Sequence, residues 1–171
     1  MKRTNVLIKI RNINFIELLI SALLVQFAIL FFMFFFFRTQ EIARDSIRKR
    51  DIFQIGQIIT NPCFIPSQIA DKEEYDLYFI LKEMGETDDI YKIAFAKTIK
   101  DPKTGTEEIS MYIYKVNKNG QECSLYANLE SRLSKETLKI TEPASGGGTG
   151  VLKDVADGWN GSPFYFQYSN K

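Results

Sequence analysis

The sequence predicts an α+β protein in which a long N-terminal helix packs against a small antiparallel β-sheet. Three observations predict this class: a run of twenty uncharged residues near the N-terminus, a helix-forming continuation after it, and short runs of β-branched and aromatic residues further on. The predicted organisation is a basic leader at 1–12, a transmembrane half-helix at 13–37, an amphipathic half-helix at 38–61 and an α+β head at 62–171.

The apolar run Leu18–Phe37 predicts the transmembrane half of the helix, because only Ser21 and Gln26 interrupt it. Twenty residues at 1.5 Å each span about 30 Å, the thickness of a bilayer's hydrocarbon core. A cleaved secretory signal is the alternative, but its apolar region would be shorter and would end in small residues. Here the run leads directly into Arg38, and Lys and Arg on both sides leave the orientation open.

The helix is expected to continue to about Thr60, because no Gly or Pro occurs between Phe37 and Gly56. The pair Asn61-Pro62 then ends it, since the residue before a proline is disfavoured in the helical region. The residues expected to form a buried apolar stripe are Ile52, Ile55, Gly56 and Ile59. The residues expected on the polar faces are Arg44, Asp45, Arg48 and Lys49.

The head is predicted to begin with a second helix at about Lys72–Glu86, capped by Asp71 and ended by Gly85. Its apolar face would consist of Leu77, Leu81 and Met84.

Strands are then expected at Ile109–Asn117, Glu122–Leu129 and Pro163–Ser169, with a tight hairpin turn at Asn119-Gly120. One face of the second strand would carry Cys123, Leu125, Ala127 and Leu129. Residues 101–106 predict a turn. Residues 145–150 predict a flexible surface loop rather than a phosphate cradle, because no Lys-Ser/Thr pair follows the glycines.

Charge and composition argue against several classes of function. The chain has 22 Lys and Arg against 21 Asp and Glu, and residues 62–171 are acidic. Direct nucleic-acid binding is not expected, since it requires a surplus of cations. The chain contains no His, which removes Ser-His and Cys-His catalytic pairs, so we expect no enzyme activity. Cys63 and Cys123 can form one disulfide, worth roughly 4 kcal/mol in the chain-entropy model, or remain two free thiols.

The eight residues Asn12–Leu19, NINFIELL, resemble the processing motif of type IV pilins and type II secretion pseudopilins, which usually reads GFTLIELL. The helical stretch 43–55, the turn at 100–106 and the segment 125–130 are also similar to parts of such prepilin-like proteins. The resemblance covers most of the chain and is most specific at Ile16–Leu19. It implies a structural subunit of a type IV pilus or pseudopilus-like filament.

The resemblance also implies processing. In this family a prepilin peptidase cuts on the cytoplasmic side and methylates the new N-terminus, which here places the cut between Asn12 and Ile13. The leader would then lie in the cytoplasm and the head outside the cytoplasmic membrane, before assembly into an extracellular filament. Asn12 replaces the usual Gly and Ile13 the usual Phe, so we expect slow processing or a peptidase of altered specificity.

Glu17 has two interpretations. As a boundary residue it would reach headgroup water at modest cost. As the resemblance implies, it pairs with the amino group of Ile13 on a neighbouring subunit, which offsets a burial cost on the order of 3 kcal/mol. The aromatic-rich run 31–37 can likewise face membrane lipid or pack against other pilin or pseudopilin subunits. Extraction from lipid would need the family's platform membrane protein and assembly ATPase.

Two other classes of function stay open. One is a non-polymerising, single-span membrane-anchored protein whose extracellular head binds a partner. The other is a membrane-anchored enzyme or a calcium-binding head, with Asp154, Asp157 and Asn160 as candidate Ca²⁺ ligands. Some secretion pseudopilins bind calcium in a similar C-terminal region, but such residues are also common in solvated loops, and no cofactor is assigned.

Overall fold

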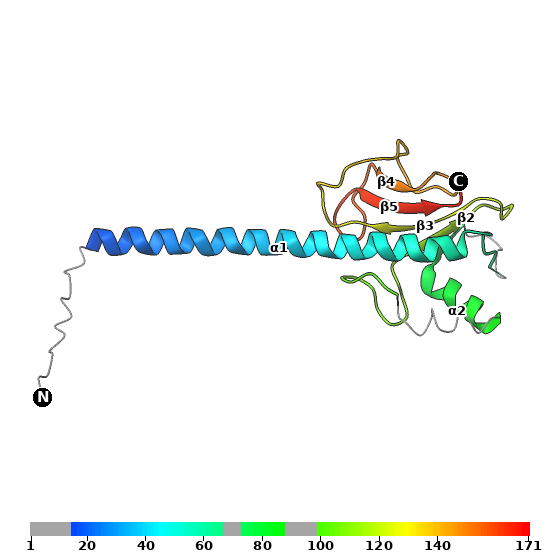
Figure 1. Ribbon diagram of the computed structural model, residues 1–171, viewed down its shortest axis with the longest axis horizontal. Coiled ribbons are helices and arrows are strands. Elements are labelled where there is room, and N and C mark those ends of the chain that lie inside the picture. The colour runs from blue at the N-terminus through cyan, green and yellow to red at the C-terminus, as the bar shows by residue number, and fades with distance from the viewer. Residues whose placement is uncertain (1–14, 67–72, 88–98) are drawn as a thin grey trace, which may run out of the picture. The chain divides into compact units, whose positions relative to one another are not determined.

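The computed structural model describes residues 15–66, 73–87 and 99–171. The described elements are α1 (Phe15–Ile59), β1 (Glu74–Asp76), α2 (Leu77–Thr87), β2 (Ile113–Val116), β3 (Cys123–Asn128), β4 (Gly150–Lys153) and β5 (Phe164–Ser169) (Figure 1). The predicted α+β class, with a long N-terminal helix and a small antiparallel sheet, is confirmed. The described residues fall into two compact units that divide after Arg38.

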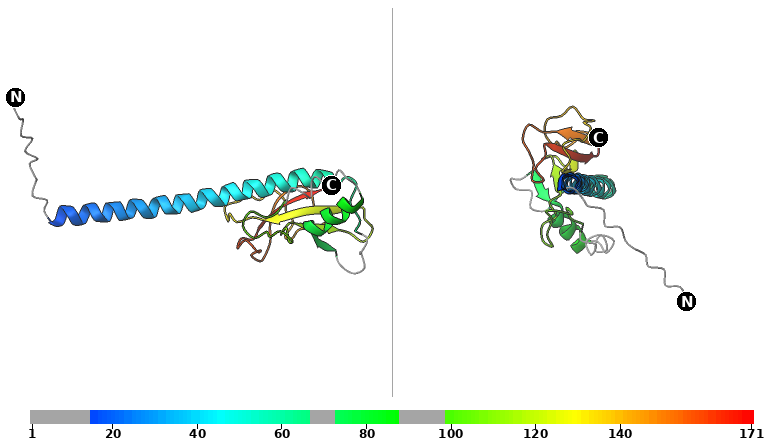
Figure 2. Two further views of the ribbon diagram at one scale, coloured as in Figure 1. Left: turned by 90° about the horizontal axis from the view of Figure 1, so that it is seen from below. Right: turned by 90° about the vertical axis from the view of Figure 1, so that its left-hand side faces the viewer.

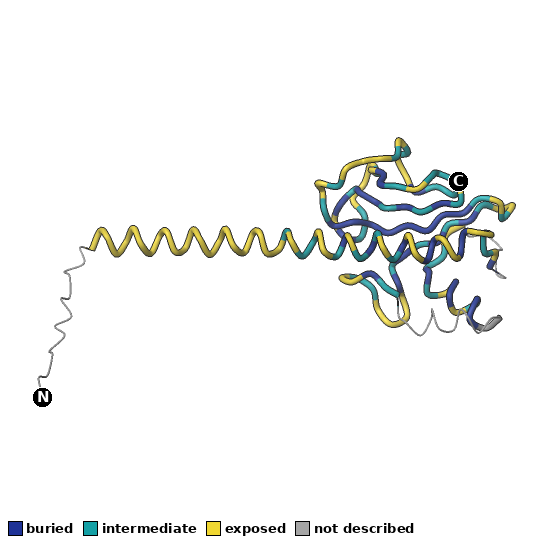
Figure 3. Tube along the Cα trace, in the orientation of Figure 1, coloured by how far each residue is buried: buried dark blue, intermediate teal, exposed yellow. Residues whose placement is uncertain are grey.

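The first half of α1 is an apolar helix in which every residue from Phe15 to Phe37 is exposed (Figure 3). It is long and apolar enough to cross a membrane. The Ser21 hydroxyl donates to the Leu18 carbonyl at 2.8 Å, so this polar group is satisfied within its own helix.

The second half of α1 packs on the sheet through the predicted stripe. Its buried residues are Asp45, Arg48, Ile52, Ile55, Gly56 and Ile59. The burial of Ile52, Ile55, Gly56 and Ile59 confirms the predicted stripe. The prediction that Asp45 and Arg48 lie on polar faces is wrong. Both are buried because carboxylates and backbone N–H groups from the head meet them, as described below.

The helix ends at Ile59, close to the predicted position. The Thr60 N–H and hydroxyl both donate to the Gly56 carbonyl, at 3.0 and 2.7 Å, which satisfies one of the last carbonyls of the helix. The peptide bond between Asn61 and Pro62 is cis and follows directly.

The five strands form one antiparallel sheet in the order β1-β2-β3-β5-β4. The predicted β2–β3 hairpin is present: Gly120 has φ of 65°, and its N–H donates to the Asn117 carbonyl at 2.9 Å. Residues of α1 and α2 join one hydrophobic cluster with alternate residues of β2 and β3, and Figure 2 shows the second half of α1 running along the sheet. All six residues of β3, the central strand, are buried.

The opposite face of the sheet is covered by the long connection between β3 and β4. Leu138 and Ile140 of this connection pack against Tyr126, Leu152 and Tyr165. The N–H groups of residues 137 and 138 donate to the Val151 carbonyl, at 2.8 and 2.9 Å, so the connection also covers the edge of β4.

Several predicted boundaries differ from the structure. The second helix starts at Leu77, because Glu74–Asp76 pair with β2 as strand β1 and the Asp76 carboxylate accepts the Tyr78 N–H at 2.8 Å. Asp71, the predicted cap, lies outside the described residues, and the helix passes Gly85 to end at Thr87.

The strand predicted at 109–117 is shorter, at 113–116, because Met111 has φ of 61° and donates its N–H to the Asp76 carboxylate at 2.9 Å. Residues 145–150 were predicted as a surface loop, but the last of them, Gly150, is the first residue of strand β4. Strands β1 and β4 were not predicted.

Candidate functional site

The exposed half of α1 presents apolar surface on every side. Four consecutive phenylalanines, Phe34–Phe37, point in four directions, since successive residues of a helix are rotated by about 100°. The side chains of the six phenylalanines between 31 and 37 are 52–73% exposed. One flat partner could cover only a part of this surface, whereas lipid or several packed helices could cover all of it.

Glu17 lies in the first turn of this helix and is its only acidic residue there. A carboxylate is favourable at this position, because the first turn carries the positive end of the helix dipole. The side chain is exposed. Asn12 and Ile13, the predicted peptidase site, lie outside the described residues.

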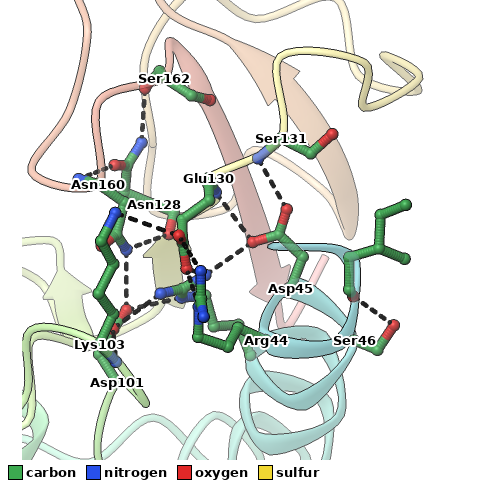
Figure 4. A network of polar contacts seen from close by, with 12 residues as sticks. Arg44, Asp45, Ser46, Asp101, Lys103, Asn128, Glu130, Ser131, Asn160 and Ser162 are labelled. Carbon is green, nitrogen blue, oxygen red and sulfur yellow. Dashed lines mark hydrogen bonds and ion pairs between the residues drawn. The ribbon is translucent and has the colours of Figure 1, made fainter. Parts of the chain in front are cut away.

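In the second half of α1, Arg48 forms the centre of a buried cluster of charged residues. Figure 4 shows the network of polar contacts that includes its partners Asp45, Asp101 and Glu130. Its guanidinium is fully buried and makes four hydrogen bonds to three carboxylates. It donates to both oxygens of Asp101 at 2.7 and 2.9 Å, to Asp45 at 2.8 Å and to Glu130 at 2.8 Å. These bonds connect the helix to the 101–106 turn and to Glu130, the second residue after the end of β3.

The carboxylates have further donors. Asp45 accepts the backbone N–H groups of Glu130 and Ser131, both at 2.9 Å. Glu130 receives a bidentate pair of bonds from Arg44, each of 2.7 Å, and an ion pair from Lys103 at 3.1 Å. The bidentate geometry adds directional specificity to the ion pair.

Asp101 organises the predicted turn at 101–106. Its carboxylate accepts the N–H groups of Lys103 and Thr104 at 2.9 and 3.0 Å, and its carbonyl accepts the N–H of Gly105 at 3.0 Å. The Asn160 side chain donates to the same carboxylate at 2.9 Å. The turn, the helix and the loop before β5 therefore meet at one side chain.

The hydrogen bonds of the cluster favour the ionised forms of Asp101, Glu130 and Arg48. Burial alone raises the pKa of Asp101 and of Glu130, but the hydrogen bonds from Arg48 and its neighbours outweigh burial. The pKa of Asp101 is lowered well below its usual range, and the pKa of Glu130 is lowered to about 2. Burial lowers the pKa of Arg48, and the three carboxylates more than restore it. Three cations thus balance three carboxylates.

Cys63 and Cys123 are joined by a disulfide, with their Cα atoms 5.8 Å apart. The bond connects the segment after α1 to the first residue of β3. The helix is therefore attached to the sheet covalently near its C-terminal end and through the charged cluster nearer its middle.

The three candidate calcium ligands have different partners in the structure. The Asp157 carboxylate pairs with Arg132, and the Asn160 side chain donates to Asp101 and to the Asn128 carbonyl. Asp154 accepts the N–H of Val155 at 2.6 Å. Within the described ranges, no group of three or more His, Cys, Asp or Glu residues is arranged to hold a metal ion.

Sequence reasoning missed the buried cluster. The available signal was the spacing of Asp45 and Arg48, which places them one turn apart on the same side of the helix as Ile52 and Ile55.

No family model, curated protein or solved structure matches this chain.

Proposed function

We propose that this chain is a structural, non-catalytic subunit of a type IV pilus or pseudopilus-like filament. The observation that carries the proposal is the division of α1 into two surfaces. Residues 15–37 are exposed on every side, and residues 45–59 are fastened to a folded head. A helix of this kind can pass from lipid into a bundle of like helices without unfolding its head.

The energetics favour such a bundle over an aqueous environment. Burying apolar surface stabilises an assembly by about 25 cal/mol per Å². The phenylalanines at 31–37 extend around the helix, so full burial needs neighbours on several sides. A helical filament supplies them, because one type of head-to-tail contact that does not close into a ring repeats indefinitely.

The charged cluster suits a subunit whose helix is pulled during filament assembly. In the proposed assembly, force applied to the helix must be transmitted to the head without separating them. Separating Arg48 from Asp101 and Glu130 would leave its own guanidinium and these carboxylates without their central ion pairs, which costs several kcal/mol. The disulfide and the apolar stripe oppose the same separation.

In the proposed filament, Glu17 determines how neighbouring subunits are aligned. After cleavage between Asn12 and Ile13, the new amino group lies four residues from this carboxylate. Among packed apolar helices each charge would need the other, so pairing between neighbouring subunits sets their stagger. The proposed partners are other pilin or pseudopilin subunits, the prepilin peptidase, and a platform membrane protein with its ATPase. The head would face the outside of the cytoplasmic membrane.

The test is the distribution of Glu17 variants between the membrane and sheared extracellular fibres. We expect Glu17→Ala and Glu17→Gln to remain in the membrane but to fall at least tenfold in the fibre fraction, because both remove the charge. Ser21→Ala, one turn further along, is the matched control, since the Ser21 hydroxyl bonds only within its own helix. Normal incorporation of both Glu17 variants would contradict the pairing role. Confinement of the unaltered chain to the membrane would favour a non-polymerising anchor.

A further inference from the structure

We propose that two copies of this chain pair in parallel in the membrane through one face of α1, with their Gln26 carboxamides hydrogen-bonded to each other. The face lies entirely within the apolar half of the helix. The inference rests on the membrane span and not on the proposed filament, so the two can fail separately.

Gln26 places a polar group in the middle of the apolar run. It lies eight residues after Leu18 and eleven before Phe37, about 12 and 16 Å from the two ends of the run along the helix axis. The side chain is too short to reach the headgroup layer over either distance. The middle of a bilayer contains no water that could bond the amide instead.

The two polar residues of the run differ in how they are satisfied. The Ser21 hydroxyl donates to the Leu18 carbonyl of its own helix at 2.8 Å. The Gln26 side chain is exposed and forms no hydrogen bond with any of the residues that the structure describes. An amide that remains unbonded in hydrocarbon is unfavourable, so Gln26 needs a partner from outside its own helix.

The surface beside Gln26 allows a second helix to approach closely. A shallow groove on this side of α1 extends from Leu18 to Leu30, and Ala22 and Ile29 are among the residues that line it with Gln26. Ala22 lies four residues before Gln26 and Ile29 three after it, so the three share one face of the helix. A small residue such as Ala22 lets two helix backbones come together in a membrane.

The same face has the spacing of a two-helix seam. Alternating steps of four and three residues, the a and d positions of a heptad, connect the residues of this face. They are Leu19, Ala22, Gln26, Ile29 and Met33. Gln26 occupies an a position, where a single polar residue fixes the register of paired helices.

A second copy is the occupant that this chemistry favours. Copies of one chain insert with the same orientation, which brings Gln26 of both helices to the same depth of the bilayer. A carboxamide carries both donors and an acceptor, so each Gln26 can donate an N–H to the carbonyl oxygen of the other. The pair then has the reciprocal contacts of a two-fold interface. Lipid chains offer neither donor nor acceptor.

The test is disulfide crosslinking of the full chain in membranes of producing cells. Cysteine is introduced singly by Ala22→Cys, on the proposed face, or by Ala28→Cys, which lies two residues from Gln26 and therefore on the opposite side of the helix. Cys63 and Cys123 are bonded to each other, so the added cysteine is the only thiol. Copper(II)–phenanthroline then oxidises pairs of thiols that lie close together.

We expect the Ala22→Cys protein to form a product of twice the chain mass, with at least fivefold less from the Ala28→Cys protein. A parallel pair places residue 22 opposite itself, whereas an antiparallel pair does not. Equal crosslinking of the two proteins would overturn the proposal, because the contact would then not depend on the face of the helix. Crosslinking of Ala22→Cys to a different polypeptide alone would also overturn it.

The role of the amide is tested in the Ala22→Cys background at low expression, where the yield follows the population of pairs. We expect Gln26→Leu to lower the yield about three- to tenfold, the effect of one interhelical hydrogen bond. Gln26→Asn keeps the amide and should retain most of the yield, and Ser21→Ala should leave it unchanged. An undiminished yield from Gln26→Leu would overturn the proposal.

Discussion

Replacement of Arg48 by alanine is the perturbation that the buried cluster makes most informative. The side chain is fully buried and donates four hydrogen bonds to Asp45, Asp101 and Glu130. The alanine variant leaves these carboxylates buried without their central cation. Breaking a buried ion pair by removing one partner costs about 3–5 kcal/mol.

The donors that remain reduce this cost. Asp101 keeps two backbone N–H groups and Asn160, and Glu130 keeps Arg44 and Lys103. These contacts prevent complete isolation of either charge, so we expect a cost near the lower end of this range, about 3 kcal/mol. For a head of this size, 1 kcal/mol corresponds to roughly 3–5 °C in melting temperature, which gives a decrease of about 10 °C.

The assay is thermal unfolding of the full chain in detergent, followed by near-ultraviolet circular dichroism. Arg50→Ala is the matched control on the same helix. Its side chain is 62% exposed and its ion pair with Asp51 measures 3.3 Å, so we expect a change within about 0.5 kcal/mol. If Arg48→Ala and Arg50→Ala lower the melting temperature equally, Arg48 does not hold the head to the helix.

Three further predictions use the same assay. The pKa of Glu130 is lowered from 4.5 to about 2, so its contribution to stability is complete above about pH 4.5 and is lost as the pH falls towards 2; a melting temperature that rises over this range on acidification would contradict the assignment. Replacing both Cys63 and Cys123 by alanine should cost about 4 kcal/mol, because the disulfide closes a loop with a sequence separation of 60, and the unaltered chain with reductant should match the variant. Gly56→Ala should destabilise the head by about 1 kcal/mol, because its Cβ would lie 2.5 Å from Cδ1 of Tyr168 and overpacking outweighs the helix propensity of alanine; a more stable variant would exclude this close contact.

The long helix and most of the sheet were predictable from sequence because their signals are periodic. Ile52, Ile55 and Ile59 recur at helical spacing, and all are buried as expected. The β2–β3 hairpin was predictable from Asn119-Gly120, since a tight turn requires a positive φ that glycine adopts without strain.

The spacing of Asp45 and Arg48 was not enough to predict the charged cluster, because charged residues on a helix usually face solvent. Asp45 and Arg48 are buried only because Asp101 and Glu130, which are distant in sequence, reach them from the turn at 101–106 and from beyond β3. Strand β1 was missed for a similar reason: Glu74 and Asp76 have low strand propensity, and the pairing of β1 with β2 determines its conformation.

The central claim is that α1 of this chain packs among like helices in a filament. The most direct measurement is intact-mass and N-terminal analysis of fibres sheared from producing cells and purified away from membranes. We predict that this polypeptide is a component of the fibres and begins at a methylated Ile13. Fibres that lack the polypeptide, while the membrane of the same cells contains it in abundance, would contradict the claim.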